Sequence, residues 1–182
     1  ISKIAGVMLL GAHGFEMAEQ GTNVFICLVE RPWDKPYGDA EFSNPKMHGP
    51  VCLNAASVRS VLPMFIERAQ WAMSGLSMEE MAARARKSKV DATPPEIGAM
   101  SYMLSKQQYL QDDGREWHPH VMFFSPKIDP ALWGANLEAS PVLGTTSDRI
   151  TIFFVPVRKW SDGTLADYQD TASAAASGGH HH

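Results

Sequence analysis

Two histidines that lie two residues apart could bind a metal ion or transfer protons. His118 and His120 stand in the stretch EWHPHVMFFSP, directly before an apolar run. In an extended segment, side chains two residues apart point to the same face, so both imidazoles and Met122 would lie together. Zinc binds imidazole, and copper binds imidazole and, when reduced, thioether. Further ligands would come from elsewhere in the chain: His13, His48, Glu116 or Asp162.

The same histidines have two metal-free interpretations. In one, His120 or His48 works with Asp162 in acid–base hydrolysis. In the other, His120 hydrogen-bonds to backbone at the mouth of a core strand, His118 and His48 are solvated, and Asp162 forms a turn with the glycine after it. The chain has no Gly-x-Ser-x-Gly elbow and no phosphate-binding glycine loop, so neither covalent serine chemistry nor nucleotide binding is supported.

Pro119 stiffens the approach to His120, because proline restricts its own backbone and that of the residue before it. A fixed ring suits a ligand or a proton carrier, and equally a histidine that bridges buried backbone groups. A structural His120 predicts that His120→Asn costs roughly 1–3 kcal/mol of stability. A functional His120 predicts a nearly unchanged stability and a loss of binding, which is the outcome that the sequence favours.

Long loops and aromatic side chains favour a third hypothesis, a non-catalytic protein that binds a small molecule or another protein. Residues 31–50 contain four prolines and read as one long loop, and such loops are often functional. The candidate ligand-binding side chains are Trp117, Trp160 and Tyr102. This binding hypothesis comes first, ahead of a zinc or copper enzyme or carrier centred on His120 and a metal-free hydrolase.

The elements that would position these residues alternate between strands and helices. Apolar runs predict strands at residues 5–11, 22–30, 99–105, 120–124 and 150–157. A helix is expected from the N-cap Asn54 to Gly75, interrupted at Pro63, and another from the capping box of Ser77 and Glu80. We expect an α+β fold with one mainly antiparallel sheet and two helices on one face. The second face of the sheet would be covered by loops or by a second subunit in a homodimer.

Length and composition fit one globular domain. The chain has 182 residues, a net charge of −4 and 45% hydrophobic residues. We expect a single domain over residues 1–165, followed by a tail at 166–182 with a linker and a histidine tag. The acidic balance gives no basic surface for nucleic acid, and no apolar run reaches the roughly 20 residues of a membrane span.

The two cysteines, Cys27 and Cys52, are compatible with two interpretations. In an exported protein the pair suggests one disulfide, and in a cytosolic protein two buried thiols. A disulfide between them would stabilise the fold by roughly 3 kcal/mol on the chain-entropy argument.

Several phrases resemble a family of uncharacterised bacterial proteins with no established activity. They span most of residues 5–165 and read GTNVFICLVER, NPKMHGPVCLNAASVRSVLP, GAMSYMLSKQQYL, WHPHVMFF and VPVRKWSDGT. The resemblance implies export to the periplasm or the cell exterior, and with it a Cys27–Cys52 disulfide. More distant members read Gly-Pro-His-Val-Met where this chain has HPHVM, which matches His120 and Met122 but not His118. The resemblance thus makes His120 the stronger single candidate.

Overall fold

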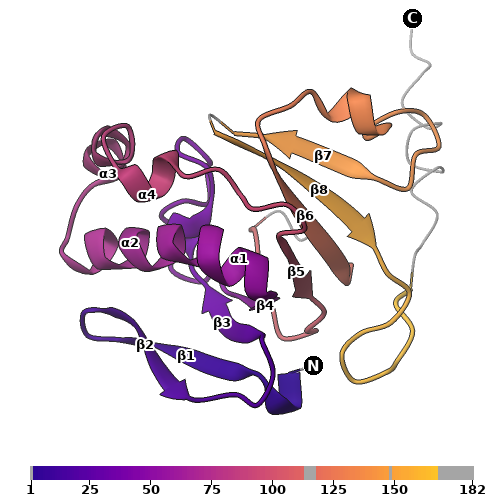
Figure 1. Ribbon diagram of the computed structural model, residues 1–182, viewed down its shortest axis with the longest axis horizontal. Helices are drawn as coiled ribbons and strands as arrows, with labels where there is room; N and C mark the ends of the chain where they lie inside the picture. Colours follow the sequence, from indigo (N-terminus) through magenta and orange to yellow (C-terminus); the bar gives the residue numbers. More distant parts are fainter. Residues whose placement is uncertain (1, 113–117, 148, 168–182) are drawn as a thin grey trace, which may run out of the picture.

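Eight strands of the described chain form one sheet in the computed structural model, in the order β2-β1-β3-β4-β5-β6-β8-β7 (Figure 1). The structure describes residues 2–112, 118–147 and 149–167. All neighbouring strands are antiparallel except β1 and β3, which are parallel. The strands are β1 (Gly6–Gly11), β2 (Gly14–Glu19), β3 (Ile26–Glu30), β4 (Gly49–Leu53), β5 (Met100–Met103), β6 (His120–Pro126), β7 (Leu143–Thr146) and β8 (Ile150–Pro156). The expected α+β fold with a mainly antiparallel sheet is confirmed.

Helices pack against one side of this sheet, and α3 and α4 lie beyond α2 in Figure 1. The α-helices are α1 (Ala55–Ser60), α2 (Leu62–Met73), α3 (Met78–Ala85) and α4 (Lys89–Ala92), and the 3-10 helices are η1 (Ser2–Ile4), η2 (Pro32–Asp34) and η3 (Pro130–Trp133). The two longer helices, α2 and α3, are those expected from the sequence. The predicted tail lies outside the described residues from residue 168 onward.

The helix ends follow the local signals in the sequence. The Asn54 side chain accepts a hydrogen bond from the Ser57 N–H at 3.0 Å, and Ser77 and Glu80 form the expected reciprocal capping box. Gly75 has a φ of 80°, a left-handed conformation that costs glycine little. The helix expected from residue 54 to residue 75 is divided at Val61, and Pro63 stands in the first turn of α2, where its missing N–H breaks no helical bond.

Three strands were not expected from the sequence, namely β2, β4 and β7. Strand β2 (GFEMAE) carries charged residues because it lies at the edge of the sheet. Strand β4 contains Pro50, and a proline argues against an interior strand. The β4–β5 pairing begins only at Cys52, so Pro50 is paired with Val29 of β3 but not with β5. The long loop therefore ends at His48 and not, as expected, at Pro50.

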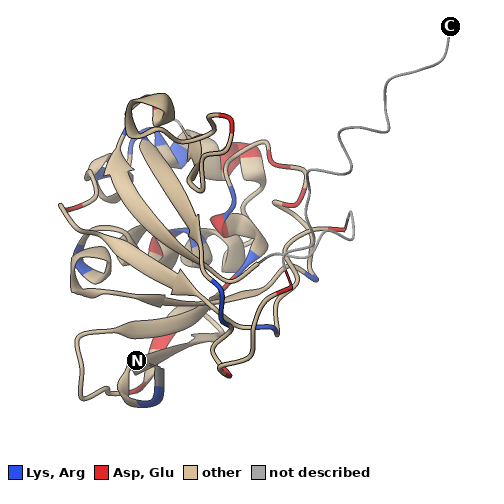
Figure 2. Ribbon diagram, turned by 90° about the vertical axis from the view of Figure 1, so that its right-hand side faces the viewer, with Lys and Arg blue, Asp and Glu red and all other residues tan. Residues whose placement is uncertain are grey.

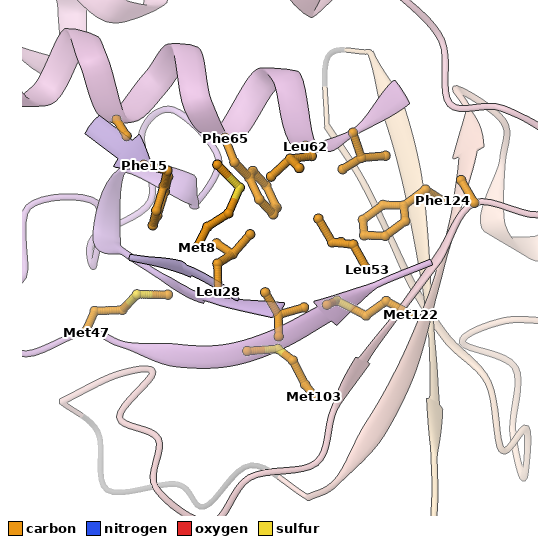
Figure 3. Close-up of a cluster of buried hydrophobic side chains, with 14 of the residues drawn as sticks. Met8, Phe15, Leu28, Met47, Leu53, Leu62, Phe65, Met103, Met122 and Phe124 are labelled. Atoms are coloured by element: carbon orange, nitrogen blue, oxygen red, sulfur yellow. The ribbon is translucent and has the colours of Figure 1, made fainter. Parts of the chain in front are cut away.

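The main core lies between α2 and the sheet. Leu62 and Phe65 of α2 point toward the sheet in Figure 3, above Leu28 and Leu53. These four side chains are at least 96% buried. A strand presents alternate residues to one face, so β6 contributes Met122 and other even-numbered residues to the same core.

A loop element covers part of the opposite face. The Trp133 ring of η3 stacks on Phe153 of β8, with ring centroids 4.3 Å apart, and Phe153 is 1% exposed. The expectation that loops supply cover is confirmed at these strands. Leu9 and Val29 remain 59% and 38% exposed on other strands, and a homodimer at such positions stays a prediction.

Cys27 and Cys52 form a disulfide, as the family resemblance implied. They are directly opposite each other on β3 and β4, and their sulfur atoms are 2.04 Å apart. The bond encloses the segment that contains η2 and the loop after it. A disulfide is consistent with an oxidising compartment.

Charges of both signs are interspersed over the molecule in Figure 2. No helix in the described part of the chain has the length and apolar character needed to cross a membrane.

Candidate functional site

A cavity of about 770 Å³ lies between the helices and the sheet. Alternate strand residues form its sheet side, in agreement with the period of two along a strand: Met103, His120, Met122, Phe124, Ile152 and Phe154. Residues at helical spacing on α2 and α3, with Val61 at the junction of α1 and α2, form its helix side: Val61, Met64, Phe65, Arg68, Ala82 and Ala85. Most side chains on these two walls are apolar, and the rest of the lining includes many polar and charged side chains. The cavity therefore suits a molecule with an apolar body and polar groups.

Of the predicted catalytic, metal-binding and aromatic ligand-binding residues that the structure describes, His120 alone lines this cavity. It is 3% exposed, and its Nδ1 lies 2.8 Å from the backbone carbonyl oxygen of His118. A carbonyl oxygen can only accept, so Nδ1 donates and Nε2 is the basic nitrogen of the ring. Burial lowers the pKa of His120, which keeps the imidazole neutral near neutral pH. The backbone bond supports a structural contribution from this histidine, next to any role in the cavity.

His120→Asn is expected to lower the free energy of unfolding by roughly 1–3 kcal/mol, because the shorter amide leaves buried partners poorly paired. This differs from the unchanged stability that the sequence favoured. Chemical denaturation measures the change, and His118→Asn is the matched control, since His118 contributes its backbone carbonyl and is half-buried. An equal loss in both variants, or no loss in His120→Asn, would contradict the structural contribution.

A pair of carboxyl groups lines the cavity at the end of β3, and sequence analysis did not find it. Glu30 shares its face of β3 with Leu28 and is opposite Gly49 of β4, so no β4 side chain stands beside it. Asp34 follows in η2, where its Oδ2 accepts the Arg31 N–H at 2.8 Å. Both residues are half-buried. Glu30 lies two positions after the buried Leu28 on the same strand, and this spacing was the signal in the sequence that the Glu30 side chain points to the same face.

The environment keeps these two carboxyls protonated at unusually high pH. Burial raises the pKa of Glu30 to about 8, with a further increase from the negative charge of Asp34 and a decrease from Lys35. Burial also raises the pKa of Asp34 to about 7, against the lowering effects of the Arg31 backbone N–H and the positive charges of Arg68 and Arg31. Near neutral pH the two carboxyls are therefore still partly protonated, whereas ordinary surface carboxylates are fully ionised.

Arg68 holds the loop that carries Asp34. Its side chain is 9% exposed, and Nη1 donates to the Lys35 carbonyl at 3.1 Å and to the Trp33 carbonyl at 3.5 Å. The guanidinium also lies 4.5 Å from the centre of the Tyr37 ring. These contacts fix residues 33–37 around the carboxyl end of the cavity.

The structure does not bring His48 or Asp162 into the cavity with His120. The His48 ring Nδ1 donates to the Lys46 carbonyl at 2.6 Å. The His48 backbone forms an isolated antiparallel β-bridge with Tyr109. Asp162 accepts from the Thr164 hydroxyl at 2.6 Å and pairs with Lys106 at 2.9 Å, contacts that lower its pKa to about 2. Asp162 thus stabilises an exposed turn.

The predicted aromatic ligand-binding residues lie elsewhere. Tyr102 points to the other face of the sheet, with its ring 5.9 Å from that of Phe25. Trp160 is half-buried in the turn after β8, where its backbone N–H donates to the Thr164 carbonyl. Trp117 lies outside the described residues. Neither Tyr102 nor Trp160 lines the cavity.

In the described part of the chain, no further metal-binding side chains are grouped with His118 and His120. Within residues 2–112, 118–147 and 149–167, no three His, Cys, Asp or Glu side chains are grouped so that they could hold a metal ion. His118 itself is half-buried and does not line the cavity. Zinc or copper binding stays a prediction from the sequence.

The chain matches no family model, no curated protein and no solved structure.

Proposed function

We propose that this protein binds a small, largely apolar organic molecule in the cavity between the helices and the sheet. The observation that carries the proposal is the cavity itself, whose volume of about 770 Å³ lies within the roughly 300–1,000 Å³ typical of ligand pockets. About half of the residues that line it are apolar, chiefly methionine, phenylalanine and aliphatic side chains, and the other half are polar or charged. Such a combination supplies affinity through apolar contact and selectivity through the polar groups.

Export is part of the proposal, and the disulfide supports it. A bond between Cys27 and Cys52 persists in an oxidising compartment and is rare in a reducing one. A binding protein in the periplasm or outside the cell fits both the cavity and the bond.

Filling the cavity is expected to abolish binding. In Ala82→Phe a ring on α3 would enter the cavity, and the affinity for octanol, a neutral apolar probe, should fall about tenfold or more. Ala83→Phe is the matched control, because Ala83 is the neighbouring half-buried alanine on α3 and does not line the cavity. Isothermal titration calorimetry and ligand-induced shifts in melting temperature measure both variants.

Binding that is equal in the two alanine variants would place the ligand elsewhere. Failure of octanol and of a wider panel of apolar alcohols, amines and acids to bind the unmodified protein would contradict the proposed function.

Acid–base catalysis is a second candidate, and the protonation of Glu30 and Asp34 favours it. A carboxyl group that keeps its proton near neutral pH can act as a general acid, and its ionised neighbour can act as a base. These two residues take the place of the Asp162 that was expected to serve in a metal-free hydrolase. Product analysis of every molecule that binds distinguishes an enzyme from a binding protein.

A further inference from the structure

The end of the cavity near β3 offers hydrogen-bond acceptors that nothing in the described chain uses. No hydrogen bond from the described residues reaches the Glu30 carboxyl. Oδ1 of Asp34 is buried and has no hydrogen-bond partner among those residues, while Oδ2 accepts from Arg31. A buried acceptor of this kind in a cavity wall is unfavourable unless a ligand or water completes it.

Two of the cations around this end, Arg68 and Arg31, make contacts with backbone carbonyls or aromatic rings. Arg68 donates from Nη1 to two backbone carbonyls and lies over the Tyr37 ring. The Arg31 guanidinium lies 5.9 Å from the centre of the Trp33 ring. Arg31 Nε and Trp33 Nε1 are also buried without a hydrogen-bond partner in the described chain, but neither residue lines the cavity, so the carboxyls are the acceptors that face a ligand at this end. The charged and titratable groups around the pair are Arg31, Lys35, Tyr37, Asp39 and Arg68.

We propose that the ligand is an organic amine, whose protonated nitrogen binds between Glu30 and Asp34 while its apolar body extends along Met103 and Met122. This inference rests on the proposed binding function and specifies its ligand class. An ammonium group has three donors and no acceptor, which matches two carboxylates with free oxygen atoms. The positive charge also offsets one of the two negative charges in a place where charge is poorly solvated.

Proton release follows from this arrangement. The two carboxyls hold protons near neutral pH, and an ammonium group binds them only when they are ionised. Amine binding therefore expels protons, and its affinity rises as the pH increases through about 7 to about 8. A neutral ligand with the same apolar body shows no such dependence.

Three probes with the same alkyl chain test the inference: octylammonium, octanol and octanoate. By calorimetry near pH 8.5, octylammonium should bind at least about tenfold more tightly than octanol, and octanoate more weakly than octanol. Near pH 6 the advantage of octylammonium should shrink about tenfold, with proton release visible as buffer-dependent heat.

Isosteric variants assign the effect to the carboxyls. Glu30→Gln and Asp34→Asn should each reduce octylammonium affinity about tenfold more than they reduce octanol affinity, and a cooperative thermal unfolding transition shows that the variants fold. Glu19→Gln is the matched control, a strand-end glutamate that is exposed and outside the cavity.

Two outcomes would overturn the inference and leave the proposed function intact. Equal binding of octylammonium and octanol would show that the carboxyls do not recognise the head group. Tightest binding of octanoate would assign the head group to Arg68 or Lys35. Binding of none of the three probes would overturn the inference as well, and the wider ligand panel then decides the proposed function separately.

Discussion

The free energy of unfolding is expected to fall by about 3 kcal/mol between about pH 5 and about pH 8, with the steepest fall near pH 6 and little change above pH 8. Most globular proteins are close to maximal stability in part of this range. The expected loss comes from Glu30 and Asp34, whose pKa values are raised by burial to about 8 and about 7. Both side chains are only half-buried, and solvent screening therefore makes this loss smaller than the two pKa shifts alone would give.

The direction of this change follows from the protons bound in each state. In the unfolded chain both carboxyls are ionised well below neutral pH, while in the folded chain they remain protonated to about pH 7 and 8. Their stabilising contribution is complete below their unfolded pKa values and is lost as the pH rises through the folded values. His120 acts in the opposite direction at the acid side, since burial lowers its pKa and its protonation favours unfolding.

Urea denaturation across this pH range measures the effect, and two isosteric variants identify its origin. Glu30→Gln and Asp34→Asn should each be more stable than the unmodified protein at about pH 9, because each lacks one of the two buried charges. Glu19→Gln, which changes an exposed carboxylate, should keep the full pH dependence. A stability that is flat or rising from about pH 5 to 7 would contradict the raised pKa values.

Those parts of the fold that depend on local signals could be predicted from the sequence. The cap at Asn54, the capping box at Ser77 and the glycine stop at Gly75 each involve residues within a few positions of one another. The missed strands depend on partners that are distant in the sequence. Pro50 is acceptable in β4 only because the β5 partner begins at Cys52, and no local pattern contains that information.

The candidate site was predicted only in part for the same reason. Local sequence placed His120 at the start of a buried strand, and the structure puts it in the cavity wall. Glu30, Asp34 and Arg68 meet through the return of α2 over residues 33–37, which is a tertiary contact. Asp162 illustrates the converse, since a turn signal with a carboxylate looks the same in sequence whether or not the turn faces a cavity.

Replacing both Cys27 and Cys52 by serine is expected to lower the free energy of unfolding by about 3 kcal/mol, because an intact disulfide restricts the unfolded chain. The bond joins residues separated by 25 positions. The enclosed segment includes Glu30, Asp34 and Met47, all of which line the cavity. The disulfide therefore limits the motion of the segment that carries the carboxyl end of the site, in addition to stabilising the whole fold.

Denaturation with and without dithiothreitol isolates the contribution of the bond. Reduction should destabilise the unmodified protein by about the same amount as the double substitution and leave the double variant unchanged. A loss below about 1 kcal/mol would mean that pairing of β3 with β4 already holds the segment in place without the bond. Because β3 and β4 exchange a full antiparallel ladder from Ile26 to Glu30, the reduced protein should keep its fold at moderate temperature. Octylammonium affinity measured on that reduced, folded protein then reports directly on how far the disulfide orders the carboxyl end of the cavity.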